Sequence, residues 1–427
     1  MVSKPVTNKP KSTKTRATSQ KSSSAKRGTA NAEAASIEAS NTPIADKAAS
    51  KETSPAKKAA AAEPPRKNPV ARKRADKPGT CNPCCPWPQG SGVKRVNVAL
   101  QGGGAHGALT WGVLDRLLED DGIEIEGISG TSAGAVNGVL LAYGITAGGR
   151  VLAQDLLRRF WKRISDIAAK SPLQPTPLDR MLGLGRMDYS PAFMALDMMS
   201  RLLSPYQFNA LALNPLRDAL EELIDFDVVR SCKDMKLFVS ATSVKRGRVK
   251  VFGLDEMSLD AVMASACLPF LQPAVEIDGE PYWDGGYMGN PAIFPLIYHT
   301  DSRDVLLIQL NPINIQHTPK SAQEILDRLN TLTFNSSLMR EMRAIKFVSD
   351  IIDGGYDDSG RLKRMLMHVI DAEDVMDDLG VSSKLNADWE FLQHLHKVGY
   401  ERTEAWLKVN RDALGVKSTV DIEEMYL

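Results

Sequence analysis

Two glycine-rich motifs lie about one strand–helix–strand unit apart within residues 96–134, and this spacing constrains how the chain can fold. We predict a strand at Val96–Leu100, a helix at about Ala105–Leu118 and a second strand at about Ile123–Ile128. A G-x-G-x-x-G motif follows the first strand, and a G-x-S-x-G motif follows the second. A glycine loop that opens a helix and a serine on a sharp strand-to-helix turn are both features of parallel α/β sheets.

The second motif indicates a nucleophile at Ser132. Its neighbours Gly130, Ala133 and Gly134 are small, so the chain can reverse sharply and lift the serine hydroxyl clear of the backbone. An apolar helix, Val136–Tyr143, is expected next, and its positive end would point at that hydroxyl. The residues alone therefore predict Ser132 as a catalytic serine.

The first motif has a matching role as an oxyanion hole. Gly102, Gly103 and Gly104 expose backbone N–H groups that no side chain covers. Together with the N–H of Ala133, these donors could hold the negative charge that develops on an attacked carbonyl oxygen. One such donor contributes about 10²–10³ in rate.

The same glycines allow a second interpretation. Gly102, Gly104 and Gly107 match the dinucleotide-binding fingerprint, in which an acid about 20 residues further on binds the ribose. Glu124 and Glu126 fall near that spacing, but they lie at the start of the predicted second strand rather than at its far end. A dinucleotide-binding oxidoreductase therefore remains the less favoured alternative.

A third motif, Asp284-Gly285-Gly286, follows a predicted β-hairpin with Asp278-Gly279 at its tip. Taken in order, the three motifs resemble those of the patatin-like phospholipase family of bacterial type. The resemblance implies an α/β fold, namely a three-layer α/β/α sandwich with a mainly parallel central sheet. It also implies a serine carboxylic-ester hydrolase that uses a Ser132–Asp284 dyad, with no cofactor and no metal.

The implied substrate is a lipid acyl ester, as for a phospholipase A or a lysophospholipase. In the glycine loop His106 stands where the family usually carries Arg or Lys, while Gly107 is kept. An esterase, a thioesterase or a storage-polyester depolymerase would share the same dyad, and a non-enzymatic scaffold is a further alternative. A Ser–His–Asp triad is less favoured, because none of the six histidines lies in a motif that predicts its delivery to Ser132. A second Asp-Gly-Gly, at Asp353, is interpreted as a helix end.

Charge is distributed unevenly along the chain. Residues 1–80 hold 18 Lys/Arg and 6 Asp/Glu, a net charge of +12, whereas the remainder has a net charge of −11. With no aromatic residue before Trp87, the N-terminal segment cannot build a core. We expect three regions: a disordered basic arm and linker at 1–92, a catalytic domain at 93–315, and a helical region at 316–427 that packs on it, with helices at 320–353, 358–371 and 386–412.

The arm is expected to be a solvated tether, with contact to an anionic surface as the alternative and with no nucleic-acid partner. Cys81, Cys84 and Cys85 fall short of a structural zinc site. With no signal peptide and no apolar run long enough to span a bilayer, we expect a cytoplasmic protein, peripheral at a membrane or at a lipid or polymer granule. Residues 171–208, rich in Met and Leu, could form a lipid-contacting lid or a cap that only packs on the sheet.

Overall fold

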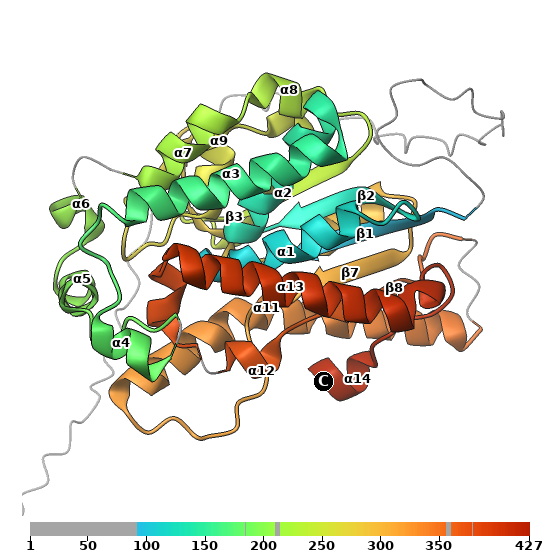
Figure 1. Ribbon diagram of the computed structural model, residues 1–427. Coiled ribbons are helices and arrows are strands. Elements are labelled where there is room, and N and C mark those ends of the chain that lie inside the picture. The colour runs from blue at the N-terminus through green and yellow to red at the C-terminus, as the bar shows by residue number, and fades with distance from the viewer. Residues whose placement is uncertain (1–91, 184, 210–213, 356–359, 378) are drawn as a thin grey trace, which may run out of the picture. The chain divides into compact units, whose positions relative to one another are not determined.

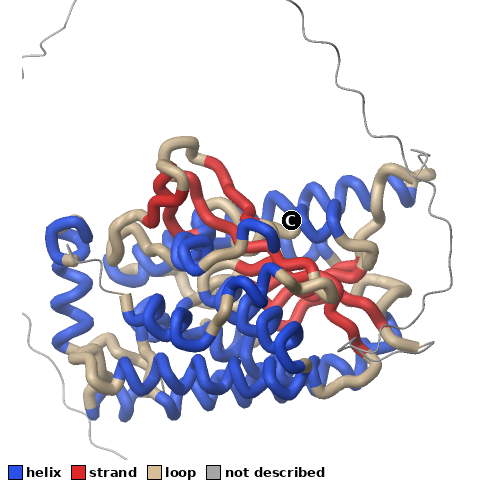
Figure 2. The backbone as a smooth tube through the Cα atoms, turned by 90° about the horizontal axis from the view of Figure 1, so that it is seen from above, coloured by secondary structure: helices blue, strands red, loops and turns tan. Residues whose placement is uncertain are grey.

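The computed structural model describes residues 92–183, 185–209, 214–355, 360–377 and 379–427. The predicted basic arm and Cys81, Cys84 and Cys85 lie outside these residues. From residue 92 onward the chain forms a central sheet with helices on both of its faces (Figures 1 and 2). The predicted α/β architecture with a mainly parallel sheet is confirmed.

The sheet has eight strands, in the order β5-β6-β3-β2-β1-β7-β8, and β4 also pairs with β3. β1, β2, β3, β7 and β8 pair in parallel, whereas β4, β5 and β6 are joined by antiparallel ladders. The strands are β1 (Lys94–Leu100), β2 (Ile123–Gly130), β3 (Lys236–Ser243), β4 (Arg248–Phe252), β5 (Val275–Ile277), β6 (Glu280–Asp284), β7 (Asp304–Ile308) and β8 (Leu366–Ile370).

The helices follow from apolar spacing and from capping residues. Ser321 and Glu324, for example, form the predicted capping box at the start of the long helix α11. The helices are α1 (Gly107–Leu118), α2 (Ala133–Gly148), α3 (Arg150–Ala168), α4 (Pro177–Leu182), α5 (Pro191–Leu202), α6 (Pro205–Phe208), α7 (Pro215–Leu223), α8 (Phe226–Arg230), α9 (Leu259–Ser265), α10 (Phe294–His299), α11 (Ala322–Asp353), α12 (Glu373–Met376), α13 (Trp389–Asn410) and α14 (Ile422–Tyr426).

Two hydrophobic cores lie on the two faces of the sheet. Because side chains alternate along a strand, β1 sends Val98 and Leu100 into one core and Ala99 into the other. The first core also takes residues of α1, α2, α3, α9 and α13, and the second takes residues of α10, α11 and α14. This arrangement fixes the carboxyl ends of β1 and β2, which carry the two glycine motifs.

The prediction of a helix at 358–371 is wrong at its C-terminal part. Leu366–Ile370 forms β8, a fully buried strand that pairs with β7 at the edge of the sheet. A short apolar run of this length fits a buried strand as well as a helix, and only its pairing with β7, about 60 residues earlier in the chain, decides between them.

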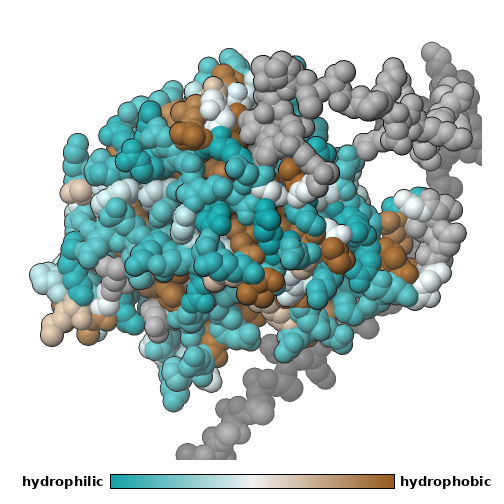
Figure 3. Space-filling model, turned by 45° about the vertical axis from the view of Figure 1, so that its right-hand side comes forward, coloured by the Kyte–Doolittle hydropathy of each residue, from teal (hydrophilic) through white to brown (hydrophobic). Residues whose placement is uncertain are grey.

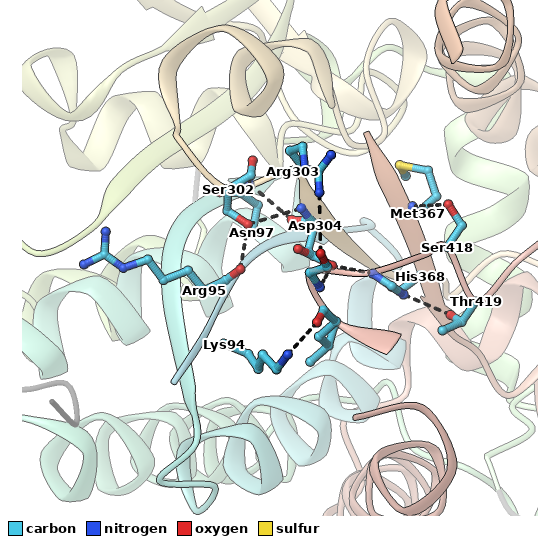
Figure 4. A network of polar contacts seen from close by, with 12 residues as sticks. Lys94, Arg95, Asn97, Ser302, Arg303, Asp304, Met367, His368, Ser418 and Thr419 are labelled. Carbon is cyan, nitrogen blue, oxygen red and sulfur yellow. Dashed lines mark hydrogen bonds and ion pairs between the residues drawn. The ribbon is translucent and has the colours of Figure 1, made fainter. Parts of the chain in front are cut away.

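A polar network connects β1, β7 and β8 near the start of β7 (Figure 4). His368 of β8 contacts Asp304 Oδ1 at the start of β7, 2.9 Å from its Nε2 atom, and Thr419 Oγ1, 3.1 Å from its Nδ1 atom. Asn97 of β1 donates to the backbone oxygens of Ser302 and Asp304. This end of the sheet is opposite to the end that carries Ser132, because β1, β2, β7 and β8 all run in parallel.

The surface is mainly hydrophilic on the face drawn in Figure 3, with apolar side chains in separate patches. Within the described residues, no helix combines the length and the apolar character that a membrane span requires. Exposed large apolar side chains are concentrated in α4, α5 and α6, the segment predicted as a lid or cap. Met187, however, is fully buried and belongs to the packing of this segment.

Candidate active site

Ser132 occupies a strained turn between β2 and α2. Its backbone has φ 54° and ψ −121°, an unusual conformation for a non-glycine residue. The Ser132 amide donates a 2.9 Å hydrogen bond to Ser265 Oγ at the end of α9. The small residues of the serine motif thus allow the sharp turn, and α9 holds the turn in place.

The glycine loop between β1 and α1 lies directly against this turn. A Cβ atom added at Gly102 would come within 2.7 Å of Ser132 Cβ, so a larger residue would separate the two loops. Gly104 has φ +60° and faces the carbonyl oxygen of Lys384, which would be 2.4 Å from an added Cβ. Both positions therefore require glycine.

The amides of the glycine loop are not equivalent. Gly102 N donates to Asn290 Oδ1 at 2.7 Å, so this amide is already used. In the described residues, the amides of Gly103, Gly104 and Ala133 have no acceptor. Of the four predicted oxyanion donors, Gly102 N is therefore occupied, and the other three amides remain as candidates.

The other motif glycines pack tightly against their surroundings. At each of them a Cβ atom would fall less than 3 Å from a neighbouring atom. They are Gly107, Gly130, Gly134, Gly285 and Gly286.

Asp284 ends β6 and is fully buried. Its Oδ1 accepts a 2.7 Å hydrogen bond from Gly286 N, and its Oδ2 has no hydrogen-bond partner within the described residues. Burial raises the pKa of Asp284 to about 7, although the Gly286 amide, the Ser132 hydroxyl and the Lys384 ammonium act in the opposite direction. The Ser132 hydroxyl is thus near enough to lower the pKa of Asp284. No hydrogen bond of ordinary geometry, however, joins Ser132 Oγ to Asp284 Oδ2.

His106 is buried and carries no charge near neutral pH. Burial, with a smaller effect from the Lys384 charge, lowers the pKa of His106 to about 3. Its Nε2 lies 2.7 Å from Ser383 Oγ, and its ring packs edge-on against Phe391 with 6.4 Å between centroids. The side chain therefore anchors the glycine loop to the C-terminal region.

The acids of the dinucleotide interpretation lie away from the glycine loop. Glu124 forms an ion pair with Arg95, and Glu126 accepts hydrogen bonds from the amides of Asp301 and Ser302, before β7 begins. Both glutamates thus interact at the end of the sheet opposite to the end that carries Gly102. They are not available to bind a ribose beside that loop.

The second Asp-Gly-Gly motif also lies elsewhere. Asp353 ends α11 and forms an ion pair with Arg364, and Gly354 is the residue that follows the helix. This agrees with its interpretation as a helix end.

Several residues that shape the site carry no sequence signal strong enough to find them. Asn311 donates from Nδ2 to Gly102 O at 2.9 Å, and Gln101 Oε1 accepts from the amides of Leu310 and Asn311. Ser265 lies in the Ala264–Pro269 segment, whose sequence is by itself too weak a signal to single it out. Asn290 follows the Asp284 motif closely, but its contact with Gly102 is visible only in three dimensions.

A cavity of about 710 Å³ opens beside the glycine loop. Its lining includes His106, Leu310 and Lys384, together with residues of α11 and of the segment after β7, but not Ser132. Ser132 itself is only 9% exposed.

Comparison with known proteins gives one family. Residues 98–297 match the family model described as patatin-like phospholipase. A search of curated protein sequences found no match.

Among solved structures, VipD from Legionella pneumophila has 18% identity and a TM-score of 0.38, with 74% of this chain and 67% of VipD covered. ExoU in its complex with SpcU, from the type III secretion system of Pseudomonas aeruginosa, has 16% identity and a TM-score of 0.31. That alignment covers 76% of this chain and 53% of ExoU, so this chain spans about half of the ExoU chain. All three motifs lie, in order, within the residues that match the patatin-like phospholipase model.

Proposed function

We propose that this protein is a lipid acyl hydrolase, of the phospholipase A or lysophospholipase type, in which Ser132 is the nucleophile and Asp284 is the base. One observation carries the proposal. The Asp284 carboxyl is fully buried, its Oδ2 has no hydrogen-bond partner in the described residues, and the hydroxyl of the strained Ser132 is near enough to lower the pKa of this carboxyl. The loop that touches the same serine offers three free amides.

The proposed cycle follows the two-step covalent route. Asp284 accepts the proton of Ser132 Oγ as this oxygen attacks the acyl carbonyl, and the amides of Gly103, Gly104 and Ala133 hold the oxyanion. The tetrahedral adduct expels the alcohol, which takes the proton from Asp284. Asp284 then accepts a proton from water, the hydroxide attacks the acyl-enzyme, and Ser132 leaves with that proton as the fatty acid is released.

The raised pKa of Asp284 suits this task. An ordinary aspartate, with a pKa near 3.9, is a weak base. A pKa of about 7 brings the carboxylate closer to the basicity that general-base catalysis at neutral pH favours. Asp284 must be ionised to act, so we expect kcat/KM to rise as the pH increases through about 7.

The positions of the histidines favour a dyad over a triad. His368 and His396 pair with Asp304 and Asp115, and His106 contacts Ser383. His299, His317 and His394 are exposed. In the described residues no histidine hydrogen-bonds to Ser132 or Asp284.

The decisive experiment compares phospholipid, lysophospholipid, neutral-lipid, thioester and short-chain ester substrates. Ser132→Ala should abolish hydrolysis of every substrate, and Asp284→Asn should reduce kcat by about 10²–10⁴. Ser231→Ala and Asp353→Asn, at exposed positions outside the site, are matched controls. Equal activity of wild type and Ser132→Ala would refute the proposal, and a preference for thioesters or soluble esters would move the substrate class while keeping the dyad.

A further inference from the structure

Lys384 is a lysine placed inside the site by the C-terminal region. It belongs to a 3₁₀ helix, η4 (Val381–Leu385), about 90 residues beyond the part of the chain that matches the family model. A charged lysine is costly to remove from water unless it is compensated. In the described residues, no carboxylate forms an ion pair with Lys384, so its charge is not neutralised by contact.

The first contact of Lys384 is with the glycine loop. Its Nζ donates a 2.9 Å hydrogen bond to Asn311 Oδ1, and Asn311 Nδ2 donates to Gly102 O at 2.9 Å. The carbonyl oxygen of Lys384 also lies against Gly104. The lysine is thus connected to the glycine loop by both its side chain and its backbone.

The second contact of Lys384 is with Phe334, which packs against the turn that carries Asp284. The Lys384 ammonium lies 5.7 Å from the centroid of the Phe334 ring. The same ring packs against Gly286, where an added Cβ would be 2.3 Å from a Phe334 ring atom. One aromatic ring of α11 therefore contacts both the lysine and the Asp284-Gly285-Gly286 turn.

Few other side chains could supply a positive charge near Asp284 in place of Lys384. His106, the basic side chain of the glycine loop, is neutral, because its pKa is lowered to about 3. The titratable groups that act on Lys384 are Asp327 of α11 and Asp284, and those that act on Asp284 include no other cation. Arg328 also lines the cavity beside the loop, but in the described part of the chain Lys384 is the cation that acts on Asp284.

Given the proposed function, on which this inference rests, we propose that Lys384 is a positioning residue for the dyad. Its ammonium favours the ionised form of Asp284 and adds positive potential at the glycine loop, where the oxyanion forms. The effect is electrostatic and acts through Asp284 and the loop, so it requires no contact between Lys384 and the substrate. Asp284 is fully buried, and low-dielectric surroundings strengthen such an effect, although Lys384 itself is only partly buried.

The inference predicts a distinctive pH profile. Burial lowers the pKa of Lys384 to about 8, while the nearby Asp327 and Asp284 carboxylates raise it. Activity should therefore need an ionised Asp284, above about pH 7, and a protonated Lys384, below about pH 8. Cys267 and Tyr287 also adjoin Asp284, but burial raises the pKa of each to about 12, so neither titrates in this range.

The test measures kcat/KM against pH on an uncharged, water-soluble short-chain ester. Lys384→Met should lower the maximum at least tenfold and move the acidic limb to higher pH, because the pKa of Asp284 rises when the cation is lost. Lys384→Arg should keep the acidic limb of the wild type and lose the alkaline decline, since arginine stays protonated. Lys397→Met, at an exposed position of α13, is the matched control.

The outcomes separate this inference from the proposed function. An unchanged profile in folded Lys384→Met, or an effect seen only with anionic substrates, would overturn the role of Lys384 while leaving the dyad intact. Loss of activity that Lys384→Arg does not restore would indicate a structural role and would also overturn it. If Lys384→Met does not fold, the alkaline limb of Lys384→Arg decides alone. Failure of Ser132→Ala to abolish hydrolysis would instead end the proposed function.

Discussion

Ser265 Oγ accepts a hydrogen bond from the backbone amide of Ser132 at 2.9 Å, so a side chain of α9 holds the strained turn of the serine. Ser265 is completely buried. This hydrogen bond couples the conformation of the serine turn to the end of α9, a helix that comes more than 100 residues later in the sequence.

Replacing this serine tests the coupling. Ser265→Ala leaves a buried amide without its acceptor, which costs about 1–3 kcal/mol. We expect kcat to fall about tenfold while the protein stays folded, as measured by ester hydrolysis and by thermal unfolding. Ser231→Ala, which removes an exposed hydroxyl that bonds only to a backbone carbonyl, should leave kcat unchanged. Equal kcat values for both variants would show that the turn does not need Ser265.

Asn290 should be equally important for the glycine loop. Asn290 Oδ1 accepts a hydrogen bond from Gly102 N, and the backbone N–H of Asn290 donates to Ser337 Oγ. Asn290→Ala frees the Gly102 amide and lets the loop shift, so kcat should fall roughly tenfold to a hundredfold with little change in KM. Asn330→Ala, in α11, serves as the control. A change confined to KM would mean that Asn290 acts on substrate binding instead.

The burial of Asp284 should cost stability in a pH-dependent way. Between the pKa of an unfolded aspartate, near 3.9, and the folded value of about 7, the native state holds a proton that the unfolded state has lost. Stability therefore falls as pH rises through this window. Asp284→Asn should stabilise the protein in urea unfolding by about 2–3 kcal/mol more at pH 8 than at pH 5.

Asp353→Asn is the control for this measurement. The Arg364 hydrogen bond lowers the pKa of Asp353, so its ionised form is favoured by folding and its replacement should not stabilise at either pH. An equal gain for Asp284→Asn at both pH values would contradict a raised pKa.

The sequence predicted the motifs better than their surroundings. Ser132 and Asp284 could be proposed from the sequence because local rules act on each: small residues permit the sharp turn, and a hairpin precedes the aspartate. The engagement of Gly102 by Asn290 could not be predicted, because it depends on which of several amides meets a side chain from a distant loop. Glu124 and Glu126 have the spacing of a nucleotide site, but their position at the start of the strand already argued against that function.

The same reasoning explains why the C-terminal region was predicted less well. β8 was assigned to a helix because its pairing with β7 is non-local. Lys384 carries no motif, and its place in the site follows from the packing of η4 on Gly104 and from Asn311. Such residues are found only when the fold has brought the segments together.

The helices α4, α5 and α6 border the site and provide a candidate lipid-contacting surface. Gly185 O accepts from Asn386 Nδ2 next to η4, and Tyr206 Oη accepts from Ala274 N near the Asp284 hairpin. Met181, Met198 and Leu202 in this segment are 87%, 61% and 72% exposed. These contacts tie the segment to both sides of the site and leave its apolar side chains facing solvent.

We expect substitution of these three residues by serine to reduce hydrolysis of phospholipid vesicles at least tenfold, because their apolar surface would no longer be buried in the lipid. Turnover of a dissolved short-chain ester and the thermal unfolding temperature should not change. Val151→Ser and Val409→Ser, at exposed positions of α3 and α13, are controls of similar character. If vesicles and soluble esters respond alike, the segment is a packed cap rather than a lipid-contacting lid.

The position of β1 has a consequence for the newly made protein. β1 is the earliest strand in sequence but lies between β2 and β7, and β8 and Lys384 come later still. At about 5–20 residues per second, Lys384 emerges from the ribosome roughly ten seconds or more after Ser132. A nascent chain therefore contains the Ser132 turn well before β8 can pair with β7 and before Lys384 can contact the glycine loop.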